Sequence, residues 1–319
     1  MIMKPADKVK LKRFKRFTIR HASYNGALDT LHRAIESGKI TGENCGAVLL
    51  GESGTGKSRI CDQLTNEFPH PKWAKSEDIQ KLVPVVKCVV PNDATVKSLM
   101  ARILRGFEAY HNYQNQEEME YCLFQTLINC KTKLLILDEW PHLYRSGTSR
   151  AIKNAADFAK VLTDLFKRPV FLVGETDAEA AIDSRSALAD RFPYRALLKP
   201  FSLETPESYN EFSKVLRCFA IHIKTEMNFV EVPPLTDEKM VLAVYISTGG
   251  NFRGLSTLLT AALTNALDRS DGHFLKEDLI IGFKHIKVSA RLTNKNPFDM
   301  TSSELQRVIA NSRNKRNRI

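Results

Sequence analysis

The chain has 319 residues and a mass of 36.1 kDa, enough for one large domain or two smaller ones with a real hydrophobic core. Hydrophobic residues make up 43% and charged residues 26%, and no apolar run approaches the roughly 18 residues of a membrane span. An integral membrane protein is therefore excluded. The basic N-terminus has no apolar stretch behind it, as a signal peptide would, so we expect a cytoplasmic protein.

The first apolar periodicity predicts a helix over residues 24–37. Five apolar-rich runs with strand character follow, and helical stretches alternate with them, one directly after Gly56 and another over 148–167. Near-continuous apolar strands that alternate with helices predict an α/β fold, a parallel sheet with helices on both faces. The strand runs are 46–50, 82–90, 133–140, 168–175 and 195–201.

Strand patterns stop after about residue 203. Thr236 begins a helix, apolar residues recur at helical spacing over 255–267, and a last helix covers about 279–286. We therefore divide the chain into an α/β domain, a small helical domain and two basic ends. The expected boundaries are 1–20 for an N-terminal arm, 21–202, 203–290 and 291–319 for a C-terminal tail.

The net charge of +11 is concentrated at the two ends of the chain. Residues 1–20 hold eight Lys and Arg against Asp7, and residues 307–319 hold five and no acid, which leaves the rest close to neutral. Phe14 and Phe17 interleave the N-terminal charges, which favours docking or stacking over a fully solvated tail. Such arms are typical of proteins that bind a polyanion, and nucleic acid is favoured over a membrane surface. The alternative is a solubilising terminus that binds nothing.

Six cysteines lie far apart and form no CxxC pair, which predicts reduced, partly buried thiols rather than a zinc site or a disulfide framework. They are Cys45, Cys61, Cys88, Cys122, Cys130 and Cys218.

Residues 51–58 match the phosphate-binding pattern GxxxxGK[ST], between a predicted strand and a predicted helix. Gly54 and Gly56 let the backbone curl so that N–H groups face a phosphate, and the helix N-terminus adds partial positive charge. Lys57 would neutralise the β- and γ-phosphates of ATP, and Ser58 would ligate Mg²⁺. The expected nucleotide-binding residues of this loop are Gly51, Glu52, Ser53, Gly54, Thr55, Gly56, Lys57, Ser58 and the following Arg59.

The strand over 134–139 ends in two acids, Asp138 and Glu139. Asp138 is placed to join Ser58 at the Mg²⁺ ion, and Glu139 to orient or deprotonate an attacking water. A glutamate at this position favours ATP hydrolysis over nucleotide binding alone.

With these motifs, the five strands and the helical appendix, residues 20–290 resemble an AAA+ ATPase. The segments GESGTGKS, LLILDEWPHL, VFLVGETD and ADRF…LLKPF resemble the TniB/TnsC group of transposition ATPases, relatives of the initiator and origin-recognition proteins. The resemblance implies a sheet in the order 5-1-4-3-2, a helical lid, and assembly into rings or helical filaments of six or seven subunits.

The same resemblance implies roles for further residues. Arg191 lies where initiator-type relatives carry the arginine that reaches a neighbouring subunit's γ-phosphate, with Arg185 as its competitor. Arg253 resembles the second sensor of the lid. Thr176, or less readily Glu175, would take the place of the first sensor. This departure from the more usual asparagine leaves a slow ATPase as one outcome.

In this group the assembly encircles duplex DNA, and two stretches here offer backbone contacts without sequence preference: Thr95 with Lys97, and Arg145, Arg150 and Lys153 around a loop at 146–149. Ordinary solvated turns are the alternative. The implied partners are transposase subunits, for which residues 300–319 would be a docking peptide, and a target-selection protein of TniQ type.

The leading hypothesis is thus an ATP-dependent regulator of DNA transposition that assembles on DNA and disassembles on hydrolysis. One alternative is an initiator-like helicase-loading ATPase, against which we count the roughly 30 residues that follow Lys287. The other is a nucleotide-gated scaffold that assembles without meaningful turnover.

Overall fold

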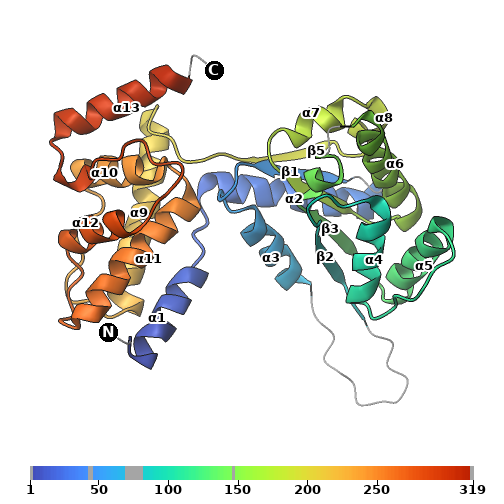
Figure 1. Cartoon of the computed structure of the whole chain (residues 1–319), viewed down its shortest axis with the longest axis horizontal. Coiled ribbons are helices and arrows are strands. Elements are labelled where there is room, and N and C mark those ends of the chain that lie inside the picture. The colour runs from blue at the N-terminus through green and yellow to red at the C-terminus, as the bar shows by residue number, and fades with distance from the viewer. Residues whose placement is uncertain (1–2, 42–45, 69–81, 146–147, 317–319) are drawn as a thin grey trace. The chain divides into compact units, whose positions relative to one another are not determined.

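The computed structural model describes residues 3–41, 46–68, 82–145 and 148–316 (Figure 1). It divides into two compact units, an α/β unit of Ser23–Leu198 and a helical unit that combines Met1–Ala22 with Lys199–Ile319. Among the described residues no helix is long and apolar enough to cross a membrane.

The α/β unit is built on a five-stranded parallel sheet in the order β2-β3-β4-β1-β5, which confirms the predicted order 5-1-4-3-2. Each strand lies within or largely within one of the five apolar runs. Their bounds are β1 Ala47–Gly51, β2 Val85–Val89, β3 Leu134–Asp138, β4 Val170–Gly174 and β5 Tyr194–Leu198.

Alternate residues of the central strands serve two separate cores, because successive side chains of a strand point to opposite faces. Leu135 and Leu137 of β3 pack with α4–α6, whereas Leu134 and Ile136 pack with α2 and α3. Helices therefore cover both faces, as Figure 1 shows. The helices of this unit are α2 Ala22–Thr41, α3 Lys57–Glu67, α4 Val96–Gly106, α5 Gln116–Asn129, α6 Ser149–Phe166, α7 Ala178–Asp183 and α8 Ser186–Ala189, with a 3₁₀ turn η1 at Trp140–Leu143.

The helical unit encloses a core of its own. Gly282 of α12 lies so close to α11 that an added Cβ would stand 2.9 Å from the Ala262 nitrogen, so this pair of helices requires glycine at the crossing. The elements are α1 Pro5–Arg16, α9 Pro206–Glu226, α10 Glu238–Thr248, α11 Phe252–Arg269, α12 Lys276–His285, the 3₁₀ turn η2 Pro297–Asp299 and α13 Ser302–Arg316.

Helices in both of the predicted basic ends, α1 and α13, pack onto the core of the helical unit. Phe14 of α1 is 1% exposed with its ring 5.5 Å from that of Phe219, and Phe17 stacks on His222 at 3.9 Å. At the other end Leu305 and Ile309 of α13 are buried in the same core. The packing of Phe14 and Phe17 agrees with the docking expected from their position between the N-terminal charges, whereas the burial of Leu305 and Ile309 was not predicted.

The five cysteines in the described part of the chain are free thiols. Cys61 and Cys88 are buried and Cys218 is exposed, while Cys45 lies outside the described residues. Burial raises the pKa of the Cys61 thiol to about 12, so this group stays protonated and unreactive in the folded chain.

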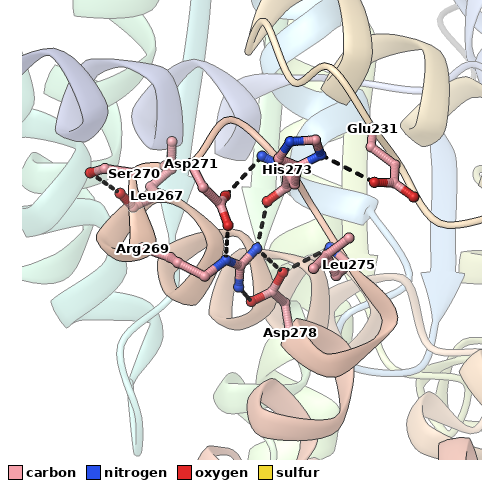
Figure 2. Close-up of polar contacts among 8 residues, drawn as sticks. All are labelled: Glu231, Leu267, Arg269, Ser270, Asp271, His273, Leu275 and Asp278. Carbon is pink, nitrogen blue, oxygen red and sulfur yellow. Dashed lines mark hydrogen bonds and ion pairs between the residues drawn. The ribbon is translucent and has the colours of Figure 1, made fainter.

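A polar cluster joins the C-terminal end of α11 to the start of α12 (Figure 2). The Arg269 guanidinium donates to both oxygens of Asp278, to Asp271 and to the His273 carbonyl. Asp278 is completely buried and also accepts from the Leu275 N–H at 2.8 Å, so it caps α12 while neutralising Arg269. One carboxylate thus closes the turn between two core helices.

Asp271 makes the exposed half of the same cluster. The hydrogen bond from Arg269 lowers the pKa of the Asp271 carboxyl, so its contribution to stability is present above the ordinary aspartate pKa of about 3.9 and is lost as the pH falls below it.

Replacing Asp278 by Ala should destabilise the helical unit by about 2 kcal/mol, because it removes the buried partner of a partly exposed guanidinium together with a helix cap. Asp271→Ala, the exposed counterpart on the same arginine, should cost clearly less, because a solvent-exposed ion pair contributes little to stability. Urea unfolding followed by circular dichroism measures both. Equal losses for the two variants would contradict the assignment.

Candidate functional site

The loop Gly51–Ser58 joins the carboxyl end of β1 to the first turn of α3. Gly54 and Gly56 have φ angles of 84° and 115°, in the region that favours glycine, and Gly56 is the residue from which α3 begins. A Cβ on Gly51 would lie 2.5 Å from the Leu198 carbonyl oxygen of β5. The glycines therefore meet two different demands, backbone curvature and close packing against the neighbouring strand.

Lys57 holds this loop closed. Its ammonium donates to the carbonyl oxygens of Gly51 at 2.6 Å and Glu52 at 3.1 Å, and the residue is only 7% exposed. The Thr55 hydroxyl donates to the same Glu52 carbonyl at 2.9 Å. A buried cation at a helix N-terminus, inside a loop of curled backbone, has the chemistry to receive the phosphates of a nucleotide.

Ser58 and Asp138, 80 residues apart in sequence, meet at the carboxyl edge of the sheet. The Ser58 hydroxyl donates to Asp138 Oδ2 at 3.4 Å, and Asp138 is 4% exposed. Within the described ranges, no three or more His, Cys, Asp or Glu residues are arranged so that they could hold a metal ion by themselves. A hydroxyl and one carboxylate suit Mg²⁺, which retains waters and takes further ligands from nucleotide phosphates.

Glu139 follows at once and adopts a left-handed backbone conformation with φ 58°. A non-glycine residue at this angle stores strain, which is common at functional sites. The strained angle turns the chain from β3 into η1, and Glu139 donates its own N–H to Asp138 Oδ1 at 3.1 Å. Its side chain remains 38% exposed, accessible to a substrate water.

A chain of polar contacts runs outward from Glu139. The Glu139 carboxylate lies 4.0 Å from His142 Nε2, and Arg145 donates to the same nitrogen at 3.3 Å and to Glu175 at 3.4 Å. His142 Nδ1 donates to the Val90 carbonyl at 2.9 Å, since a carbonyl can only accept. The ring is thereby fixed beside the catalytic candidate.

His142 was not predicted from the sequence, although its spacing of three residues from Glu139 in a short helical turn was a signal. Arg145, one of the residues expected to contact DNA, lies in contact with His142 and Glu175.

The residues expected to act as the first sensor follow the end of β4, and Glu175 joins this chain of contacts through Arg145. Thr176 is exposed, and Glu175 is partly exposed and paired with Arg145. The guanidinium offsets the negative charge that makes a glutamate unfavourable near phosphate. Gly174, just before them, packs so tightly on η1 that a Cβ would stand 2.7 Å from Pro141.

The two arginine-finger candidates differ in their surroundings. Arg191 forms a two-point pair with Asp164, at 2.9 and 3.1 Å, and donates to the Ala187 carbonyl at 2.8 Å. For the Arg185 side chain, the part of the chain that the structure describes offers no hydrogen bond or ion pair. To reach another molecule, the Arg191 side chain would have to break its pair with Asp164. The Arg185 side chain would have no such pair to break among the described residues.

Arg253 belongs to the helical unit, in the first turn of α11, where Asn251 caps the helix by accepting from the Gly254 N–H at 3.0 Å. Its side chain is exposed. The preceding Gly250 has φ 74°, and a Cβ there would collide with the Phe201 carbonyl oxygen at 2.1 Å.

The residues expected to contact DNA follow β2 and β3, which are neighbours in the sheet, so both stretches lie at its carboxyl edge. Thr95 uses its hydroxyl to cap α4, accepting from the Ser98 N–H at 3.1 Å. Lys97, Arg150 and Lys153 are exposed near the first turns of α4 and α6. Residues 146 and 147 of the second stretch lie outside the described residues.

The sheet order and the loop between β1 and α3 define the AAA+ P-loop fold. The model of a protein family described as "Bacterial TniB protein" matches residues 10–201. The chain therefore belongs to the TniB family. Comparison with curated proteins found no match.

Among solved structures, Cdc6p of Pyrobaculum aerophilum matches 81% of this chain with a TM-score of 0.55 and 16% identity. Orc1 of Aeropyrum pernix, solved in complex with DNA, matches 88% of this chain with a TM-score of 0.52 and 14% identity. A RuvB mutant of Thermotoga maritima matches 86% of this chain with a TM-score of 0.51 and 14% identity. This chain spans 66%, 65% and 74% of their respective lengths. At these identities the likeness establishes the shared fold.

Asp138→Asn should remove the effect of Mg²⁺ on nucleotide binding while leaving the fold intact, because the amide replaces a buried carboxylate at nearly equal volume. In thermal melts, Mg²⁺ with ATP at about 100 times its dissociation constant should stabilise the wild type by about 2.7 kcal/mol. The variant should show only the smaller effect of ATP without metal. A full Mg²⁺-dependent gain in the variant would place the metal elsewhere.

Proposed function

We propose that this TniB-family protein is an ATPase that regulates DNA transposition: it binds Mg²⁺–ATP, oligomerises on duplex DNA and disassembles after hydrolysis. The observation that carries the proposal is the meeting of Lys57, Ser58, Asp138 and Glu139 at one edge of the sheet, contributed by a phosphate loop and the end of an acidic strand.

Each residue has a distinct task in hydrolysis. Lys57 exchanges its carbonyl contacts for phosphate oxygens and neutralises charge that grows toward the leaving group. Ser58 and Asp138 hold Mg²⁺, which when bound offsets the phosphate charge. Glu139 orients the attacking water and accepts its proton, with His142 limiting the space in which that carboxylate moves.

Binding to DNA is supported by cations at helix N-termini. Lys97 lies at the start of α4, and Arg150 and Lys153 at the start of α6, where the helix dipole disfavours positive side chains. Neither first turn contains an acid. Their placement is unfavourable for the isolated fold and favourable for a phosphate backbone, which would add no sequence preference. The solved Orc1 structure contains DNA, in keeping with this use of the fold.

The remaining parts of the proposal rest on the resemblance to the TniB/TnsC group. A TniB protein of the TnsC type would link a target-selection factor of TniQ type to transposase subunits, as a ring or filament of six or seven copies. Arg253 of α11 would sense the γ-phosphate in its own subunit. Arg191 would reach the γ-phosphate of the next subunit once its pair with Asp164 opens.

One observation favours a second candidate, a nucleotide-gated scaffold with little turnover. Both Arg191 and the first-sensor segment are engaged in ion pairs, with Asp164 and Arg145 respectively. Single-turnover hydrolysis with and without duplex separates the two candidates: assembly without DNA-stimulated phosphate release would favour the scaffold.

Lys57→Ala should abolish ATP binding and ATP-dependent assembly on DNA together, because the buried cation at the phosphate site is lost.

Glu139→Gln should bind and assemble normally but remain on DNA, since an amide cannot accept the proton. Light scattering follows assembly on duplex DNA when ATP is added, which tests the Lys57 variant, and dissociation when ATP is removed, which tests the Glu139 variant. Normal assembly of the Lys57 variant, or wild-type dissociation of the Glu139 variant, would contradict these assignments.

Mixing two inactive variants tests the trans arginine. Arg191→Ala alone should reduce the hydrolysis rate by about 10³-fold. When the Arg191→Ala protein is mixed with the Glu139→Gln protein, activity should recover. At some interfaces of the mixed assembly the first variant supplies Glu139 and the second supplies Arg191. Arg185→Ala is the matched control: recovery with this variant and not with Arg191→Ala would assign the role to Arg185.

A further inference from the structure

The excess positive charge of the protein belongs to the helical unit. Residues Ser23–Leu198 hold 22 Lys and Arg against 22 Asp and Glu, so the whole net charge of +11 falls on the other unit. The DNA contacts proposed above all lie in the neutral unit. The charge of the helical unit therefore requires a separate explanation.

Helix α1 arranges part of this charge in a line. Lys8, Lys12 and Arg16 recur every four residues, and Lys4 at the N-cap continues the row. Residues four apart are neighbours on the helix surface, so these side chains form a continuous row that winds gradually around the helix. We call these four residues the α1 ridge. All four are exposed, and none makes an ion pair or side-chain hydrogen bond with any residue the structure describes.

The ridge stands on a fixed support. The opposite face of α1 packs against its own unit through Phe14, 1% exposed, and the segment after the helix is anchored by Phe17 stacked on His222. Figure 1 shows α1 beside α11, with which it makes contacts. Because the helix is docked, its cations are held in a row before any partner binds.

The fold itself gains nothing from this row. Like charges four residues apart repel each other, and Lys4 and Lys8 lie toward the positive end of the helix dipole. Asp7 is the one acid in α1. Such an arrangement becomes favourable when an extended polyanion lies along it.

The structure favours duplex DNA over a membrane as that polyanion. A helix that lies in a membrane surface needs a free apolar face, and the apolar face of α1 is occupied by its own unit. Val9, 49% exposed, is the one large hydrophobic residue exposed on α1. From Lys4 to Arg16 the ridge spans about 18 Å, roughly the axial length of five phosphates on one strand.

We propose that the α1 ridge is a second DNA-binding surface, which contacts the phosphate backbone of a duplex independently of the residues at the carboxyl edge of the sheet. This proposal rests on the proposed function, in which the protein binds duplex DNA, and it assigns four of the contacts with the DNA phosphates. Binding through the ridge is non-specific and requires no hydrolysis.

The test is the salt dependence of binding to a fluorescent duplex in the presence of Mg²⁺–ATP. Each phosphate contact adds about 0.9 to the slope of log K against log salt, so replacing Lys4, Lys8, Lys12 and Arg16 by Ala should reduce the slope by about 3.6. Alanine favours helix, so α1 should persist, which circular dichroism checks. Lys4→Arg, Lys8→Arg and Lys12→Arg together should retain the wild-type slope.

A matched control removes four exposed cations of the same unit that lie on four different helices, by changing Lys214, Lys239, Lys284 and Arg307 to Ala. Its slope should stay near the wild-type value. If wild type binds DNA and the ridge variant keeps the full slope, the ridge assignment fails and the proposed function stands. If wild type binds no duplex, both fail. Loss of binding to phosphatidylserine vesicles with an unchanged DNA slope would assign the ridge to membranes.

Discussion

The site depends on one buried cation. Lys57 lies within a loop whose own carbonyl oxygens satisfy its ammonium, and these contacts hold the loop in a curled conformation. Removing an ammonium from water is costly unless such partners compensate. A phosphate that replaces the carbonyls offers full opposite charge in the same place. The geometry that closes the loop on itself is therefore also the geometry that prepares it for nucleotide.

The parallel sheet brings further candidate site residues to the same place as this loop. Because all five strands run the same way, the loop after β1, the acids after β3 and the segment after β4 meet at one edge. Around Glu139, close packing and strain fix the backbone, through its left-handed φ and through contact between Gly174 and Pro141. The remaining freedom lies in side chains such as Arg145 and Arg191, which are held by pairs that other groups can replace.

Much of the fold was predictable from sequence, since buried parallel strands are continuous apolar runs and the phosphate loop has fixed spacing. The pairing of Ser58 with Asp138 also follows from motif order. Side-chain partners were not predictable in this way. Nothing local indicates that Arg191 lies against Asp164 or that Arg145 lies against Glu175, because these contacts join elements far apart in the chain. The termini show the same limit: the sequence indicated that the N-terminal end docks, but the core that buries Phe14 and Leu305 is formed by residues far away in the chain.

Calorimetric titration of the full-length protein with ATP tests the central claim most directly. We predict binding of one nucleotide per chain, with an affinity that rises when Mg²⁺ is present. If saturating ATP produced no heat and did not compete with ADP for the protein, the central claim would be contradicted. The loop around Lys57 would then be closed on its own carbonyls for structural reasons alone.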